Sequence, residues 1–150
     1  MNARHLLFKT SRFNLSEIKE NFINPCCLGE DLAQWLRKKL VEEGVNVRTP
    51  GQEDWGWYLR LRYGRESYLL AIGTSGNEEV RAGKEGEWRI IVKKNPSIRR
   101  LLLNRARMTD DDPIAAKIRW ILRQERDFRD IRTEPDPSEH GQSDSTGIRR

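Results

Sequence analysis

Two strands and the turn that joins them can be read from residues 55–72, whose sequence is WGWYLRLRYGRESYLLAI. In the first half of this stretch, every second residue is a Trp or a Leu, and most of the residues between them are polar. In the second half, Tyr68, Leu70 and Ile72 repeat the same spacing. Alternation of this kind places the two sets of side chains on opposite faces of a strand, and residues 63–66 supply the turn. We therefore expect an antiparallel pair. Its first strand has one apolar and one polar face, whereas Leu69 and Ala71 in the second strand indicate burial on both faces.

Weaker patterns on either side of this pair complete the expected fold. Apolar residues recur on one helical face between Leu28 and Leu40, and Asp112-Pro113 is a strong helix start. The expected elements are a strand at 5–9, a helix at 29–43, strands at 45–48, 55–62, 68–72 and 88–93, and helices at 97–106 and 113–130. This order, β-α-β-β-β-β-α-α, predicts the α+β class, with an antiparallel sheet of four to five strands and helices packed mainly on one face. We expect one core, formed by Trp35, Leu36, Trp55, Trp57, Leu59, Leu70, Ile90 and Ile118.

The length and composition indicate one domain followed by a polar tail. The chain has 150 residues, of which 36% are hydrophobic and 34% charged, and its net charge is +5. A chain of this length fits a single domain, which we assign to residues 1–130. Residues 131–150 are rich in Pro, Gly, Ser and Asp, a composition typical of disorder.

Targeting and metal-binding signals are absent from the sequence. No apolar run approaches the ~18 residues that a membrane span requires, and the first residues do not resemble a signal peptide. The two cysteines, Cys26 and Cys27, are adjacent, which disfavours an ordinary disulfide and fits a reducing compartment. We therefore expect a cytoplasmic protein with no cofactor, no metal and no membrane partner.

Catalytic signals are weak. The only histidines are His5 and His140, close to the two ends of the chain, and no zinc-protease or phosphate-loop motif occurs. Glu53 and Asp54 remain as candidates for acid–base chemistry without histidine. We therefore expect a protein that is not an enzyme, and we keep a small enzyme using these carboxylates as the third hypothesis.

The most distinctive segment combines acidic and aromatic residues at the start of a strand. Its candidate binding residues are Glu53, Asp54, Trp55, Trp57 and Tyr58. Gly56 separates the two indoles, and a glycine in a strand can mark close approach of a ligand or of backbone. One interpretation is an aromatic recess with an acidic rim, suited to a basic peptide or amine. The other places both indoles in the core, with the two acids on a solvated turn.

Basic residues form the second candidate surface. Arg60 and Arg62 alternate with apolar residues of one strand, and Arg89 and Lys93 do so in another. If both polar faces belong to the same side of the sheet, these four residues form a positive surface with Tyr58 nearby. Basic residues with exposed aromatics suit single-stranded nucleic acid. The alternative is an ordinary solvated sheet face, in which nearby glutamates dilute the positive charge.

Two motifs carry a resemblance to other proteins. Residues 23–36 read INPCCLGEDLAQWL, and residues 52–57 read QEDWGW. Together they resemble a group of small bacterial proteins without an assigned function. The resemblance covers residues 13–60 and implies no activity.

These observations favour a non-enzymatic cytosolic module that binds another protein or a peptide. The alternative is a nucleic-acid-associated protein that uses the face of Arg60, Arg62, Arg89 and Lys93. The sequence leaves the oligomeric state open.

Overall fold

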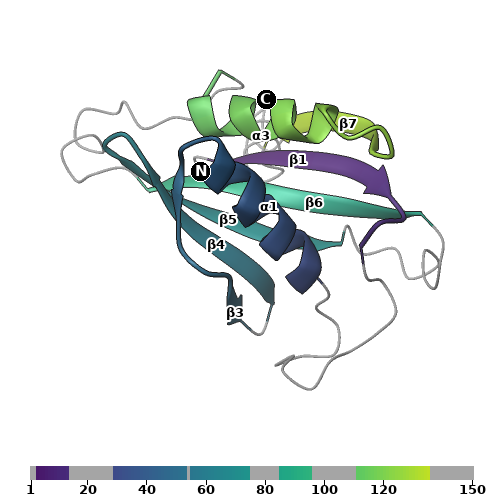
Figure 1. The fold of residues 1–150 in the computed structure, drawn as a ribbon, viewed down its shortest axis with the longest axis horizontal. Helices are drawn as coiled ribbons and strands as arrows, with labels where there is room; N and C mark the ends of the chain where they lie inside the picture. Colours follow the sequence, from purple (N-terminus) through teal and green to yellow (C-terminus); the bar gives the residue numbers. More distant parts are fainter. Residues whose placement is uncertain (1–2, 14–28, 54, 75–84, 96–110, 136–150) are drawn as a thin grey trace, which may run out of the picture.

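A computed structural model describes residues 3–13, 29–53, 55–74, 85–95 and 111–135. Its elements, in chain order, are β1 (Ala3–Thr10), α1 (Glu30–Glu42), β2 (Asn46–Val47), β3 (Gly51–Glu53), β4 (Gly56–Tyr63), β5 (Glu66–Thr74), β6 (Gly86–Asn95), α3 (Pro113–Arg123) and β7 (Arg129–Pro135). The described strands form one sheet of seven, in the order β2-β4-β5-β6-β1-β7, and β3 also pairs with β4 (Figure 1). All the pairings are antiparallel.

The α+β class agrees with the sequence pattern, but the expected number of four to five strands is wrong. The two strands without a predicted counterpart are β3 and β7. β3 has only three residues and follows Pro50, so it shows no alternation long enough to detect. β7 reads RDIRTEP, which is too polar to suggest a strand. It forms because its backbone pairs with β1 along the edge of the sheet.

The last helix is shorter than its expected span of 113–130. α3 ends at Arg123, and β7 occupies the first five residues of the expected tail, 131–135. Residues 136–150 lie outside the described ranges, as do the expected helix at 97–106 and the adjacent cysteines.

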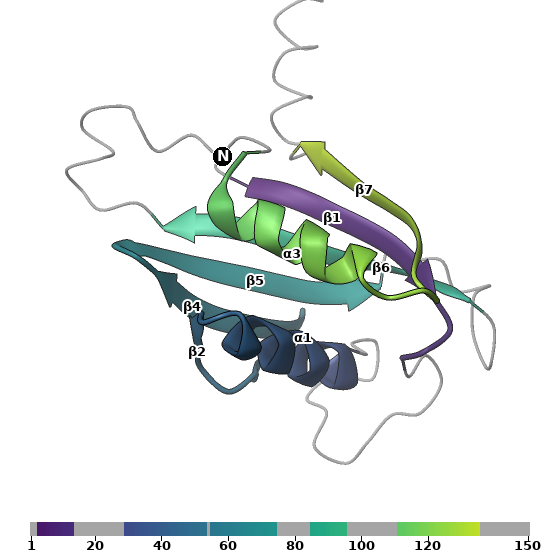
Figure 2. The same cartoon turned by 45° about the horizontal axis from the view of Figure 1, so that its top comes forward.

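Both described helices lie on the same face of the sheet (Figure 2). α1 contacts β2 and β4, and α3 contacts β1 and β7. The apolar core fills the space between these helices and the sheet. Its buried members include six of the eight expected core residues: Leu36, Trp57, Leu59, Leu70, Ile90 and Ile118. Trp35 is partly buried against this core, whereas Trp55 is 52% exposed and lies outside it.

A buried carboxylate ties α3 to the sheet. Asp112 is the N-cap of α3, and its Oδ1 accepts hydrogen bonds from the backbone N–H groups of Ile114 and Ala115 at 2.9 and 3.1 Å. Its Oδ2 accepts a 2.9 Å hydrogen bond from the Tyr68 hydroxyl of β5 and lies 3.6 Å from Lys94 Nζ of β6. One side chain therefore caps the helix and joins it to two strands.

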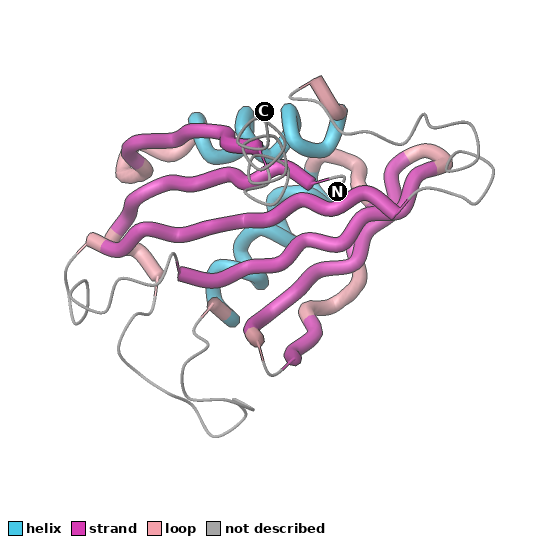
Figure 3. Tube along the Cα trace, turned by 180° about the vertical axis from the view of Figure 1, so that it is seen from behind, coloured by secondary structure: helices cyan, strands magenta, loops and turns pink. Residues whose placement is uncertain are grey.

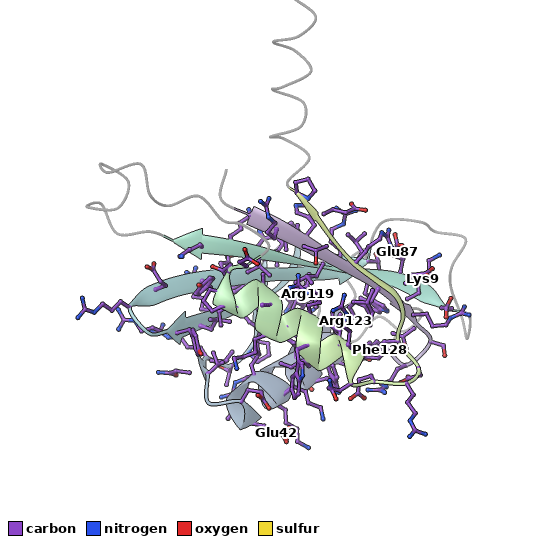
Figure 4. The ribbon with its side chains drawn as sticks, turned by 90° about the horizontal axis from the view of Figure 1, so that it is seen from above. Lys9, Glu42, Glu87, Arg119, Arg123 and Phe128 are labelled. Carbon is purple, nitrogen blue, oxygen red and sulfur yellow. The ribbon has the colours of Figure 1, made fainter. Side chains whose placement is uncertain are left out.

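An aromatic cluster closes one end of the core. Phe128, labelled in Figure 4, follows α3 and packs on Phe8 of β1 with the ring centroids 4.8 Å apart. Phe13 and Trp35 lie beside it, with centroids 5.9 and 5.2 Å from the Phe128 ring. Arg12 covers Phe128 at 4.6 Å and hydrogen-bonds to Asp127. Phe128 thus joins the core from a loop, which explains why its position extends the helical pattern beyond the true helix end.

Candidate functional site

The sheet face opposite the helices, called here the open face, is not covered by either described helix (Figure 3). Because side chains alternate along each strand, the strand register identifies which residues point to this face. They are Tyr58, Arg60 and Arg62 of β4; Ser67, Leu69, Ala71 and Gly73 of β5; Glu87, Arg89, Ile91 and Lys93 of β6; Ala3, His5, Leu7 and Lys9 of β1; and Arg132 and Glu134 of β7.

The four basic residues singled out in the sequence all belong to the open face. Arg60 lies opposite Leu69, which in turn lies opposite Lys93, so these residues form one row across three strands. Arg62 is two residues further along β4, and Arg89 lies on β6. Arg60, Arg62 and Lys93 are exposed, whereas Arg89 is half-buried. The shared polar face expected from the two alternation patterns is therefore present.

A fifth basic residue, Arg48, was not among the sequence candidates. Its backbone N–H donates a 2.9 Å hydrogen bond to the carbonyl of Arg60, which extends the β2–β4 register and places the two arginines opposite each other. Arg37 of α1 holds this segment in place, because its Nε lies 3.2 and 3.1 Å from the carbonyl oxygens of residues 47 and 48. That Arg48 is a neighbour of Arg60 follows from the pairing of β2 with β4 and not from the sequence alone.

The three arginines at this end line one hollow, called here the arginine hollow. Its volume is about 390 Å³, and its walls include Arg48, Arg60 and Arg62 together with Asn46 and Ser67. Within the described part of the chain, these three arginines and Lys93 form no ion pair with a carboxylate. The hollow therefore presents positive charge that no carboxylate of the described ranges neutralises.

Two aromatic side chains extend the basic row. The Tyr58 ring lies against Gly51 of β3, where an added Cβ would stand 2.2 Å from the ring carbon Cζ. The Arg60 guanidinium covers the same ring, 5.4 Å from its centroid. Trp55 follows, with its ring centroid 6.1 Å from that of Tyr58. Glycine at position 51 thus leaves room for an aromatic residue that is held between a strand and a cation.

The two indoles expected to share a site lie apart. Trp55 belongs to the turn between β3 and β4 and is exposed, whereas Trp57 is only 4% exposed and belongs to the core. Gly56, between them, has φ = 150°, a conformation that interrupts the regular alternation of a strand. Neither the recess walled by both indoles nor the fully buried pair is therefore correct. Glu53 is exposed at the end of β3, and Asp54 is not described.

Acidic residues are concentrated at the other end of the open face. Glu87 and Glu134 both contact Arg132, at 2.9 and 3.1 Å. Lys9 lies opposite Glu87 in the β1–β6 register (Figure 4) and contacts Asp130 at 3.2 Å. Charges are therefore paired on β1, β6 and β7 at this end, while the arginines at the β2–β4 end are left without such partners among the described residues.

His5, the one described histidine, contacts an arginine. Arg89 Nη1 lies 2.7 Å from His5 Nδ1 on the open face. Because arginine is only a donor, Nδ1 must accept, and the imidazole is neutral. His5 therefore helps to position the Arg89 guanidinium. This contact is with an arginine and not with a nucleophile, so it does not indicate a catalytic role. Searching the described residues also finds no group of three His, Cys, Asp or Glu that would hold a metal ion.

No family model, curated protein or solved structure matches the chain. The resemblance to small bacterial proteins stays a prediction. Neither described helix has the length and apolar character needed to cross a membrane. The residues of the open face are therefore the basis for assigning a function.

Proposed function

We propose that this protein is a non-enzymatic, cytoplasmic binding module that holds single-stranded nucleic acid across the open face. The backbone would be held by Arg48, Arg60, Arg62 and Lys93, and bases would stack on the exposed Trp55, which lies beside Tyr58. A positively charged groove with aromatic side chains along it is the usual arrangement for binding single strands.

The observation that carries this proposal is the pair formed by Arg48 and Arg60. Like charges directly opposite each other on neighbouring strands are destabilising, and Arg62 adds a third positive charge in the same hollow. No described carboxylate offsets this repulsion. An anionic chain would relieve it, because each phosphate brings a negative charge between the guanidinium groups. Such an arrangement suits binding rather than stability.

The dimensions of the surface also suit an extended strand. From Tyr58 to Arg62 the strand β4 advances four residues, which is about 13 Å, and Trp55 lies in the turn before this strand. Single-strand sites typically hold about 4–16 nucleotides, so this surface would hold a stretch near the short end of that range. Trp55 lies in the turn that begins β4, and Tyr58, Arg60 and Arg62 follow it along that strand, as a continuous bound chain requires.

The positions of the acidic residues bear on the choice between nucleic acid and a basic peptide as the ligand. Four glutamates were expected to dilute the basic face. Glu66 belongs to the helix-facing set of β5, Glu87 contacts Arg132, and Glu78 and Glu79 lie outside the described residues. Of the acidic rim proposed for a basic peptide, Glu53 is exposed at the end of β3, and Asp54 lies outside the described residues. Because Glu53 is exposed, it also lacks the burial that tunes a carboxyl group for acid–base catalysis. Nucleic acid is therefore the ligand that the geometry favours over a peptide.

The proposal is tested by fluorescence anisotropy with labelled, mixed-sequence single-stranded RNA and DNA of about 12 nucleotides, between about 50 and 200 mM salt. Four phosphate contacts predict a log–log salt slope of about −3 on single strands. The double variant Arg60→Glu/Arg62→Glu should weaken binding at least tenfold and lower the slope to about −1.4, because two contacts remain.

The matched control is Lys38→Glu/Arg123→Glu, which makes the same charge change at exposed positions on the two helices. This control should bind as the wild type does, and both double variants should keep their melting temperatures within a few degrees. Absence of binding at low salt would overturn the proposal, as would equal weakening by both double variants. A concentration-dependent dimer in light scattering that the Arg60/Arg62 variant dissociates would assign the face to a second copy instead.

A further inference from the structure

A second cavity lies on the open face beside the exposed indole. Its volume is about 150 Å³, and its lining includes Trp55, Ala71, Gly73, Thr74, Arg89 and Ile91. At ~30 Å³ per molecule, this corresponds to roughly five waters, which is room for a flat ring but not for a folded peptide. The cavity shares no lining residue with the arginine hollow, so it is a distinct feature of the same face.

The floor of this cavity is flat and open. Gly73 is part of its lining, and a Cβ added there would meet no atom within 4 Å. Ala71 and Ile91, directly opposite each other in the β5–β6 register, supply an apolar surface next to it. Trp55, 52% exposed, forms the aromatic wall. A planar ring placed over Gly73 would therefore contact apolar surface below and an indole at its side.

Arg89 supplies the polar group of the cavity. Its position is fixed at two points: it lies opposite Gly73 in the register, and its Nη1 is 2.7 Å from His5 Nδ1. Among the described residues it has no carboxylate partner, so its other N–H donors remain for a ligand. An arginine held in this way presents a planar fork of donors, which matches two acceptors on one edge of a ring.

We propose that this cavity binds a single base of the bound strand against Trp55, and that Arg89 selects guanine. Guanine presents two neighbouring acceptors, O6 and N7, on one edge, and an arginine fork pairs with both. Cytosine offers an amino donor on the corresponding edge, which arginine repels. This inference rests on the proposed binding of single strands and adds a preference to it.

The test compares a cytidine-only RNA of about eight nucleotides with the same RNA carrying one central guanosine. For the wild type we expect the guanosine to tighten binding about fivefold or more. In Gly73→Leu the new side chain fills the cavity without a clash, because a Cβ at this position meets no atom within 4 Å. This variant should therefore lose the preference for guanosine. Its affinity for the cytidine-only RNA, held by the arginine hollow, should stay within about twofold of the wild type.

Arg89→Lys separates recognition from charge. Lysine keeps the positive charge but loses the planar fork, so the salt slope should be unchanged while the preference for guanosine falls to about twofold or less. The melting temperatures of both variants would confirm that the sheet is intact.

Retention of the full preference in either folded variant would overturn the inference. Equal binding of both RNAs by the wild type would also overturn it but leave the proposed function standing. Failure of the wild type to bind either RNA would refute the proposed function itself, and the base site with it.

Discussion

Replacing Asp112 by alanine should destabilise the fold more than any surface substitution, because four contacts end on this carboxylate. It caps α3 through two backbone N–H groups. It also accepts from the Tyr68 hydroxyl at 2.9 Å and lies 3.6 Å from Lys94 Nζ. Asp112 is only 5% exposed, so water cannot easily replace the lost oxygen atoms.

The magnitude follows from these contacts. Loss of an N-cap costs about 0.5–2 kcal/mol, and a buried hydroxyl left without its partner costs about 1–3 kcal/mol. The Lys94 side chain is 13% exposed, so water still reaches its ammonium group. Removing its carboxylate partner therefore costs less than the loss of one partner from a fully buried ion pair, which is about 3–5 kcal/mol. We expect a total near 3–4 kcal/mol, which lowers the melting temperature by on the order of 10 °C. Asp112→Asn, which keeps a capping oxygen, should lose about half as much.

Urea unfolding followed by circular dichroism and tryptophan fluorescence measures these losses, provided that the two signals change together. Arg126→Ala is the control, because Arg126 is an exposed charged residue that follows α3; it should change stability by no more than about 0.5 kcal/mol. A loss below about 1 kcal/mol for Asp112→Ala, smaller than a typical cap alone, would show that the carboxylate does not tie α3 to the sheet.

Three further predictions follow from individual side chains. Trp57→Ala should cost about 3–5 kcal/mol in urea unfolding because the ring is buried, whereas Trp55→Ala should change stability by less than about 1 kcal/mol; similar losses would contradict their placement. Burial of the Tyr68 hydroxyl, reinforced by the charge of Asp112, raises the pKa of Tyr68 well above its usual range. The protonated hydroxyl therefore contributes its full stabilisation of the fold below about pH 10, and this contribution is lost as the pH rises further. Urea unfolding of Tyr68→Phe should therefore show a flatter decline in stability above that pH, and an unchanged decline would refute this linkage. Gly51→Ala should displace the Tyr58 ring and weaken RNA binding severalfold in anisotropy, with a melting temperature only a few degrees lower.

Much of the local structure could be predicted because it depends on neighbours in the chain. The helical spacing of apolar residues placed α1 within one residue of its observed ends, and Asp112-Pro113 marked the start of α3. Alternation along β4 and β6 also predicted that Arg60 and Lys93 point away from the core. In each case the period of the element fixes which face a residue occupies, and no distant contact is needed.

Other features required the complete fold because they depend on segments far apart in the chain. β7 is a strand because it pairs with β1, whose paired residues lie 120 or more positions earlier in the chain. The polar sequence of β7 would not by itself predict a strand. The turn between β3 and β4 moved Trp55 out of the core that its spacing predicted.

By itself, the sequence determined the α+β class, the main helices and strands, and the direction of the basic side chains, since all of these follow from local periodicity. The tertiary structure decided that Arg48 lies opposite Arg60 and that Gly73, Arg89 and Trp55 enclose one cavity. The physical reason is that cross-strand neighbours are set by register, and register is settled when whole faces are buried together rather than by the residues of one strand.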